Sequence, residues 1–139
     1  MDMFAIIIGT HGRLSEELLS SVDMIFGEMQ NTAAVTFLPG EGAADIAAKY
    51  EAALDKLDTS GGVLFLVDIF GGTPYNAACR IVINNERYGI VTGVSMPMLV
   101  DMANTQAMDE GTDIRTLMEK AEGVGQKGVR LFHMSMVNN

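Results

Sequence analysis

Two short stretches of this sequence are apolar at every position, and they constrain the fold more than any other feature. Residues 63–67 read VLFLV, and residues 5–8 read AIII directly before Gly9. A strand with one face in water alternates apolar and polar residues, whereas a strand that is apolar throughout is buried on both faces. Such strands are typical of a parallel sheet covered by helices. The sequence therefore predicts an α/β fold.

Strands and helices alternate along the whole chain. Strands are predicted at residues 5–8, 32–38, 63–67, 88–94 and 128–134. Apolar residues at helical spacing predict helices at residues 15–26, 43–57 and 73–84, around 98–103 and after 112, with Ser15, Thr73 and Thr112 as expected N-caps. The alternation predicts one doubly wound domain over residues 1–139 with a mainly parallel sheet. We take the strand order to be 2-1-3-4, one of the usual orders of such sheets.

Composition limits the class of protein. The chain has 139 residues, 48% of them hydrophobic, which is enough for one domain with a sizeable core. Its apolar runs are too short to span a bilayer, and the N-terminus lacks the basic region of a signal peptide. A single cysteine, Cys79, excludes an internal disulfide and fits a reducing cytosol. The formal net charge of −9 disfavours nonspecific nucleic-acid binding, which depends on neutralising phosphates.

The candidate functional residues are His11 and Asp68, each of which follows a buried strand in a glycine-containing loop. If the strand order is 2-1-3-4, the two loops meet at the switch point of the sheet, where α/β proteins bind ligands. A carboxylate that accepts a hydrogen bond from one imidazole nitrogen leaves the other nitrogen free as a nucleophile. The pair therefore predicts covalent chemistry on His11, with Asp68 orienting the ring.

The loops around this pair offer groups that could hold an anion. Gly71 and Gly72 lead into Thr73 and a predicted helix N-terminus, whose free N–H groups and dipole favour negative charge. Thr10 and Gly12 flank the histidine similarly. The sequence lacks the lysine and spacing of a P-loop, and no GxGxxG follows the first strand. The pattern favours a phosphoryl group held transiently on a side chain, with no metal ion or nucleotide cofactor.

Each of these residues also has a purely structural interpretation. A histidine after a strand is usually a polar loop residue, Asp68 could cap its loop, and the double glycine could serve a tight turn. Cys79 lies on the buried face of its predicted helix and is expected in the core. His133, near the end of the last predicted strand, is expected to be structural or exposed. Spacing alone leaves the functional and structural interpretations about equally supported.

Several segments together resemble the enzyme IIA component of mannose-type phosphotransferase systems, the mannose, fructose and sorbose superfamily that moves phosphate from phosphoenolpyruvate to an incoming sugar. The segments, in chain order, are IIIGTHG, FLPGE, GVLFLVD, GGTP, NAACRIV and GVSMPML. The resemblance covers nearly the whole chain, and it depends on the segments together, because any one of them alone is weak.

The resemblance implies that His11 is phosphorylated at Nε2, that Asp68 hydrogen-bonds its Nδ1, and that the Thr73 hydroxyl lies beside the phosphoryl group. The implied donor is the histidine-containing phosphocarrier protein. The implied acceptor is a IIB component, with membrane IIC and IID components downstream. The resemblance also implies a cytoplasmic homodimer whose last strand is exchanged between subunits and pairs antiparallel.

Two features depart from some relatives. The sequence stops at Asn139, where some relatives continue into a fused IIB domain, so it resembles a free-standing IIA protein. Phe70 stands where some relatives have tryptophan before the double glycine. The Phe70 difference is expected to affect partner contacts and leaves the sugar specificity open.

Other functions remain open on sequence grounds. The phosphocarrier subunit of a dihydroxyacetone kinase system shares the fold and the histidine chemistry, although FLPGE and GVLFLVD with GGTP favour the sugar transporter. A non-catalytic regulatory module could use the same fold. A histidine phosphatase would need further arginines and a second histidine in the pocket, and only His133 is available.

Overall fold

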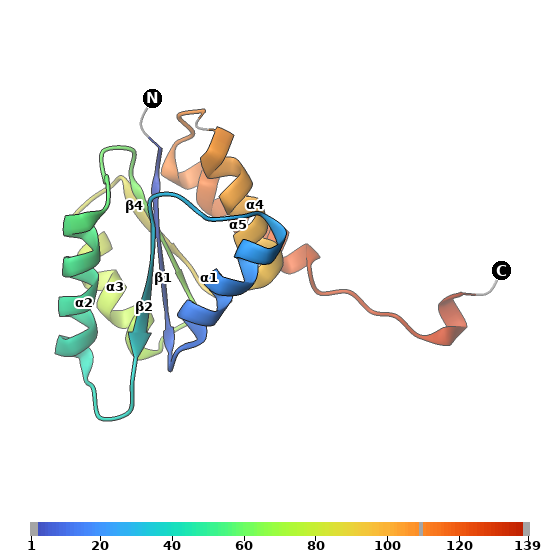
Figure 1. Ribbon diagram of the computed structural model, residues 1–139, viewed down its shortest axis with the longest axis horizontal. Coiled ribbons are helices and arrows are strands. Elements are labelled where there is room, and N and C mark those ends of the chain that lie inside the picture. The colour runs from blue at the N-terminus through green and yellow to red at the C-terminus, as the bar shows by residue number, and fades with distance from the viewer. Residues whose placement is uncertain (1–2, 109, 138–139) are drawn as a thin grey trace.

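The computed structural model describes residues 3–108 and 110–137, and a four-stranded sheet forms its centre (Figure 1). All strand pairs are parallel, and the order β2-β1-β3-β4 confirms the predicted fold class and strand order. The strands are β1 (Ala5–His11), β2 (Thr32–Phe37), β3 (Val63–Val67) and β4 (Tyr88–Val91). The helices are α1 (Leu14–Ile25), α2 (Ala43–Lys56), α3 (Thr73–Val82), α4 (Met96–Met108) and α5 (Ile114–Lys127), with a 3₁₀ helix at Met134–Met136.

Helices cover both faces of the sheet, as the apolar strands predict. Helices α1, α4 and α5 lie on one face, and α2 and α3 lie on the other (Figure 1). Because side chains alternate along a strand, β1 sends Ile6 and Ile8 into one core and Ala5 and Ile7 into the other. Every residue of β3 is buried. The ends of these two strands therefore have rigid support.

Among the described residues, no helix has both the length and the apolar character to cross a bilayer.

Helix α1 begins differently from the prediction. Its N-cap is Arg13, which makes no side-chain capping bond, whereas Ser15 lies inside the first turn and is buried. The Ser15 hydroxyl donates to the carbonyl of Val35 at 2.8 Å, and its N–H donates to Oγ1 of Thr10 at 2.7 Å. Thr10 therefore supplies the oxygen that Ser15 was expected to provide, because β1 and α1 pack closely enough for the contact.

The other two predicted caps are each displaced by one residue. Gly72 is the N-cap of α3, so Thr73 is the first residue of the helix and its hydroxyl does not cap it. Asp113, and not Thr112, caps α5 by accepting a hydrogen bond from the N–H of Thr116 at 2.8 Å. A carboxylate at this position also favours the positive end of the helix dipole.

The predicted fifth strand at residues 128–134 is wrong for the single chain. After α5 the chain is extended as far as residue 133, pairs with no strand among the described residues and runs away from the domain (Figure 1). Val129, Leu131 and Phe132 are 82%, 84% and 78% exposed. A strand needs a neighbouring strand to pair with its backbone N–H and C=O groups. Within the described part of the chain, the extended segment lies beside no other strand.

The burial pattern predicts a large difference between two chemically identical substitutions. Ile46 in α2 is fully buried, whereas Ile83 just after α3 is 83% exposed. Ile46→Ala should lower the free energy of unfolding by about 2–5 kcal/mol through lost burial and a cavity. Ile83→Ala should change it by no more than about 0.5 kcal/mol. Urea unfolding of both variants measures the difference, and equal effects would contradict this account of the core.

Candidate functional site

His11 is the last residue of β1 and lies at the carboxyl edge of the sheet. Its side chain is 45% exposed. The ring meets Phe37 of β2 edge to face, with centroids 5.7 Å apart and planes at 81°. Gly12 follows with a φ of +60°, a conformation that favours glycine, and the chain turns away there. The strand and the Phe37 ring thus fix one side of the imidazole and leave the other accessible.

Asp68, the residue after β3, is held in place by three N–H donors. The backbone N–H of His11 donates to Oδ2 at 3.0 Å, and the ring Nδ1 of His11 lies 3.0 Å from the same oxygen. The N–H of Ile69 donates to Oδ1, also at 3.0 Å. Because a carboxylate only accepts hydrogen bonds, we assign the ring proton to Nδ1, which leaves the lone pair on Nε2. The structure therefore brings together the two residues that the sequence placed at neighbouring strand ends.

The loop before α3 lies against the Nε2 side of the ring. A Cβ on Gly72 would lie 2.9 Å from Cε1 of His11 and 3.6 Å from Nε2, so a larger residue would push the ring away. Gly71 has a φ of +81°, and the side chain of Asn76 donates to its carbonyl at 3.1 Å. Thr73, the first helical residue, is half-buried. The N-terminus of α3 therefore begins beside the His11 ring, and the N–H of its N-cap Gly72 donates to the carbonyl of Ile69 at 3.3 Å.

Thr10 and Gly12, the other predicted anion-binding residues, have their polar groups engaged elsewhere. Thr10 is fully buried, and its Oγ1 accepts the Ser15 N–H described above. The N–H of Gly12 donates to the carbonyl of Phe37 at 2.8 Å. These bonds join β1 to α1 and β2, so the two residues support the histidine from within the fold.

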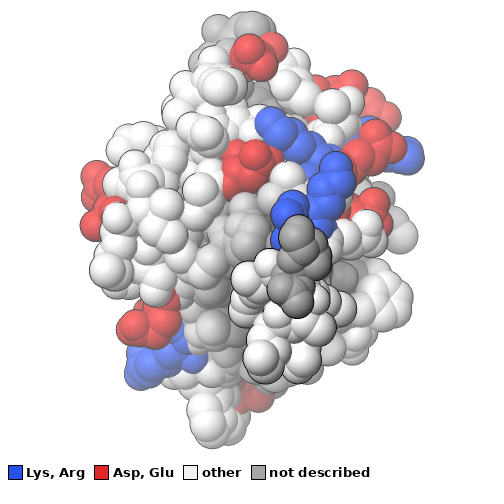
Figure 2. Space-filling model, turned by 90° about the vertical axis from the view of Figure 1, so that its right-hand side faces the viewer, with Lys and Arg blue, Asp and Glu red and all other residues white. Residues whose placement is uncertain are grey.

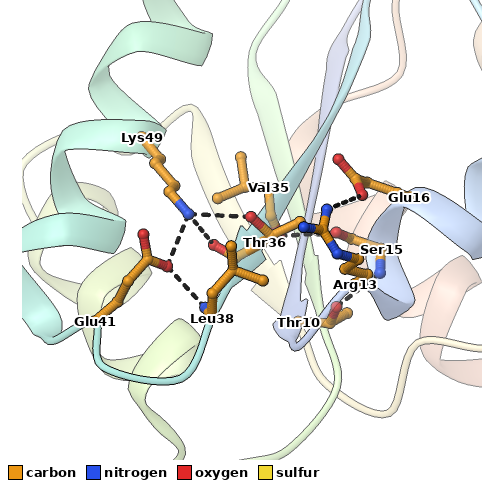
Figure 3. A network of polar contacts seen from close by, with 9 residues as sticks. All are labelled: Thr10, Arg13, Ser15, Glu16, Val35, Thr36, Leu38, Glu41 and Lys49. Atoms are coloured by element: carbon orange, nitrogen blue, oxygen red, sulfur yellow. Dashed lines mark hydrogen bonds and ion pairs between the residues drawn. The ribbon is translucent and has the colours of Figure 1, made fainter.

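A polar network beside the site fixes the turn after β2 (Figure 3). Nζ of Lys49 donates to the carbonyl and the hydroxyl of Thr36, both at 3.0 Å, and to Oε1 of Glu41 at 2.8 Å. Glu41 also accepts the N–H of Leu38 at 2.7 Å. The hydrogen bond from Lys49, and next the one from Leu38, hold the pKa of the Glu41 carboxyl below its ordinary value. The FLPGE segment thus secures the end of β2, where Phe37 meets the histidine ring.

Arg13 and two residues discussed on sequence grounds, Cys79 and His133, lie outside the site formed by His11, Asp68 and the loop before α3. Arg13, after the histidine loop, is engaged with Glu16 at 3.3 Å (Figure 3). Cys79 is half-buried in α3, less buried than expected. His133 was expected to be either structural or exposed, and it is exposed. Its Nδ1 lies 2.9 Å from Oγ of Ser135. Within residues 3–108 and 110–137, no group of three or more His, Cys, Asp or Glu side chains is placed to hold a metal ion.

Two residues that support the site carry no signal in the sequence. Phe37 touches the histidine ring, yet it occurs in an ordinary β-strand pattern. Tyr50 reads as part of the apolar face of α2, yet its hydroxyl donates to the carbonyl of Pro74 at 2.8 Å, at the start of α3. Both contacts join segments far apart in the chain, so only the packed fold shows them.

Comparison with known proteins shows the family of the chain. A family model described as "PTS system fructose IIA component" matches residues 5–121. The chain belongs to this mannose-type IIA family of the phosphotransferase system. Proteins of this family are components of sugar phosphotransferase systems, so the chain is a IIA component of that type.

Relatives of this IIA component include proteins of different length. The mannose-specific EIIAB component of Escherichia coli strain K12 is 46% identical over 126 residues, which cover 91% of this chain and 38% of that protein. The chain therefore spans well under half of that relative. The fructose-specific EIIA component of Bacillus subtilis strain 168 is 36% identical over 129 residues, which cover 93% of this chain and 86% of that protein.

Solved structures agree with the fold. The mannose/sorbose-specific IIA subunit from Enterococcus faecalis superposes with a TM-score of 0.83 at 27% identity, covering 95% of this chain and 96% of that one. An EIIA component from Streptococcus agalactiae superposes with a TM-score of 0.82 at 23% identity, covering 96% and 99% of the two chains.

The contact between Gly72 and the ring gives a direct test of the site geometry. Gly72→Ala should displace the imidazole of His11 and weaken its hydrogen bond to Asp68, because the new Cβ would lie 2.9 Å from Cε1. NMR of the ring nitrogens should show a smaller share of the Nδ1–H tautomer than in the unmodified protein. Gly123→Ala in α5 is the matched control, since a Cβ there meets nothing within 4 Å. Unchanged ring resonances in Gly72→Ala would contradict the geometry.

Proposed function

We propose that residues 1–139 form one IIA phosphocarrier domain that works in the cytoplasm. His11 accepts a phosphoryl group on Nε2 from the histidine-containing phosphocarrier protein and passes it to a IIB component. The IIB component in turn serves the membrane IIC and IID components for coupled uptake and phosphorylation of a sugar. The observation that carries this proposal is the 3.0 Å contact between Nδ1 of His11 and Oδ2 of Asp68, because it leaves the accessible nitrogen as the nucleophile.

The transfer step follows from that geometry. The lone pair of His11 Nε2 forms a new N–P bond, while the N–P bond of the donor's phosphohistidine breaks and its electron pair returns to the donor ring. The His11 ring gains positive charge as the bond forms, and the carboxylate of Asp68 stabilises that charge. Transfer to the IIB component runs the same step in the other direction, with an acceptor side chain of IIB as the nucleophile. The step needs no metal ion or nucleotide.

The start of α3 is the proposed site for the phosphoryl oxygens. The backbone N–H groups of Gly71 and Thr73 lie at a helix N-terminus, where the dipole favours an anion, and the Thr73 hydroxyl offers a further donor. The N–H of Gly72 donates to the carbonyl of Ile69 at 3.3 Å, so this residue would have to exchange that bond for one to the phosphoryl group. Gly72 brings this backbone against the ring, beside Nε2. Thr10 and Gly12 are assigned a supporting role, because their polar groups are engaged within the fold.

An apolar rim around the histidine is suited to docking of protein partners. Leu14, Ile69 and Phe70 are 45%, 55% and 73% exposed, and all three lie within a few residues of His11 or Asp68 in the chain. Exposed apolar residues close to a reactive group support transient contact with another protein. This rim is the proposed contact surface for the phosphoryl donor and acceptor.

We also propose a homodimer in which the segment after residue 128 is exchanged between subunits. Figure 2 views the side from which this segment projects and shows uncharged surface beside Lys and Arg side chains. Over residues 129–137 the segment carries one Lys, Arg, Asp or Glu side chain, that of Arg130. A groove of about 650 Å³ lies next to the edge strand β4, with Phe70, Tyr75, Ile90 and Met118 among its lining residues. The free edge of β4 would supply the backbone partners that the extended segment lacks in its own subunit.

The names of the relatives favour the sugar transporter over the dihydroxyacetone kinase subunit, since they specify mannose and fructose systems. A regulatory module without chemistry is disfavoured by the oriented His11–Asp68 pair. Mass spectrometry after incubation with phosphoenolpyruvate and the general phosphotransferase proteins tests the proposal. Phosphate should map to His11, and the absence of any phosphohistidine would favour the regulatory module.

Substitutions at the pair should separate the nucleophile from the residue that orients it. His11→Ala should abolish phosphorylation without loss of the fold, because the side chain lies at the sheet edge and is 45% exposed. His133→Ala should retain phosphorylation. Asp68→Asn should slow single-turnover transfer about ten- to thousand-fold, because the amide can donate to Nδ1 and favour the wrong tautomer. Asp58→Asn, at an exposed carboxylate elsewhere, is the control. Wild-type rates in Asp68→Asn, or phosphate on Nδ1, would contradict these roles.

Removal of the C-terminal segment tests the dimer. A chain that ends at Gly128 should be monomeric in light scattering and should melt at a lower temperature, because the exchanged segment would bury apolar residues against the partner. Leu131→Asp should weaken the dimer in the same direction. Met24→Asp, at an apolar residue of α1 that is 88% exposed, is the matched control and should leave the dimer intact. A truncated chain that stays dimeric with unchanged melting would refute the exchange.

A further inference from the structure

Tyr50 of α2 is a fully buried tyrosine whose hydroxyl lies between β1 and the start of α3. The hydroxyl donates to the carbonyl of Pro74, the second residue of α3, at 2.8 Å. The ring meets Phe65 of β3 edge to face, with centroids 5.2 Å apart and planes at 80°. Burial raises the pKa of this hydroxyl well above its ordinary value, and the charge of Asp68 raises it further. The hydroxyl therefore stays protonated and remains a hydrogen-bond donor beside the site.

The hydroxyl has room only because residue 9 is glycine. A Cβ on Gly9 would overlap the hydroxyl oxygen of Tyr50 and would lie 2.9 Å from two carbons of its ring. Gly9 belongs to β1, two residues before His11, and pairs with Val67 of β3, the residue directly before Asp68. The tyrosine therefore touches the strand that carries His11 and, through the same atom, the helix that borders the histidine ring.

These contacts form a closed path around the site. Strand β1 leads from Gly9 to His11, and the ring of His11 rests on Gly72. The chain then enters α3 at Pro74, and the hydroxyl of Tyr50 joins Pro74 back to Gly9. This hydrogen bond thus adds a polar contact, next to the apolar packing of α3 on the sheet, that helps to set how far the N-terminus of α3 lies from the end of β1.

We propose that Tyr50 is a positioning residue for phosphoryl transfer, whose hydroxyl holds the N-terminus of α3 at the distance from His11 that the transferred group requires. This inference rests on the proposed role of His11. Backbone donors stabilise a transition state only when they are aligned in advance, and small displacements of such groups are costly in rate. Tyr50 itself touches no reacting atom and acts through Pro74 and the loop before it.

Tyr50→Phe is the decisive variant because it removes the hydroxyl and retains the ring that packs on Phe65. The rate of single-turnover transfer from the phosphorylated phosphocarrier protein should fall about three- to thirty-fold at saturating donor, while the donor concentration for half-maximal rate stays unchanged. The backbone amide resonances of Gly71, Gly72 and Thr73 should shift. Tyr88→Phe is the matched control, since the Tyr88 ring packs against the same core. This variant should neither slow the transfer nor shift the amide resonances.

The outcomes separate this inference from the function on which it rests. If the unmodified protein is never phosphorylated, the proposed function fails and the inference fails with it. If the unmodified protein is phosphorylated on His11 and Tyr50→Phe transfers at the same rate with unshifted loop amides, only the inference is overturned. A variant that loses stability but keeps the wild-type rate while folded would show that Tyr50 is merely structural.

Gly9→Ala approaches the same contact from the opposite side. The added Cβ would push the hydroxyl away from Pro74, so the substitution should slow transfer in the presence of Tyr50. Gly9→Ala should slow transfer less when it is combined with Tyr50→Phe. The most severe overlap of the new Cβ is with the hydroxyl oxygen of Tyr50, and Tyr50→Phe removes that oxygen. Equal slowing in both backgrounds would overturn the inference.

Discussion

The burial of β1 and β3 on both faces is the constraint on which the rest of the structure depends. Two strands without a polar face must lie inside the sheet as parallel neighbours, covered by helices on either side. Their register pairs Gly9 with Val67, so the residues that follow each strand emerge together at the carboxyl edge. The contact between His11 and Asp68 is a consequence of this core packing.

The geometry of the His11–Asp68 pair is well defined because backbone N–H groups also bind the carboxylate. The same carboxylate oxygen accepts both the backbone N–H and the ring Nδ1 of His11, each at 3.0 Å, and the other oxygen accepts the N–H of Ile69. The carboxylate is therefore tied to the strand as well as to the ring, which limits rotation of either group. Glycines complete the site, since Gly72 admits the ring and Gly9 admits the hydroxyl of Tyr50.

The C-terminal segment shows the limit of a strand pattern as a structural signal. Val129, Leu131 and Phe132 have the composition of a strand, and the extended backbone after α5 agrees with it. Yet composition indicates only that a segment can pair, and pairing requires a free edge at the right place. In one subunit the segment lies beside none, and its apolar residues remain exposed. The wrong prediction here therefore concerns the location of a neighbour, while the extended conformation is correct.

The sequence by itself determined the parallel α/β fold and placed His11 and Asp68 each at the end of a buried strand, and the assumed order 2-1-3-4 made those strands neighbours. It could do so because burial on both faces and helical periodicity are local patterns that survive without knowledge of distances. Only the tertiary structure decided which group caps α1, that Phe37 and Gly72 border the histidine ring, and that Tyr50 reaches Pro74. Each of these contacts joins segments that are distant in the chain, and its length depends on how a helix packs on the sheet. No residue pattern encodes that spacing, because it emerges only when the whole core is filled.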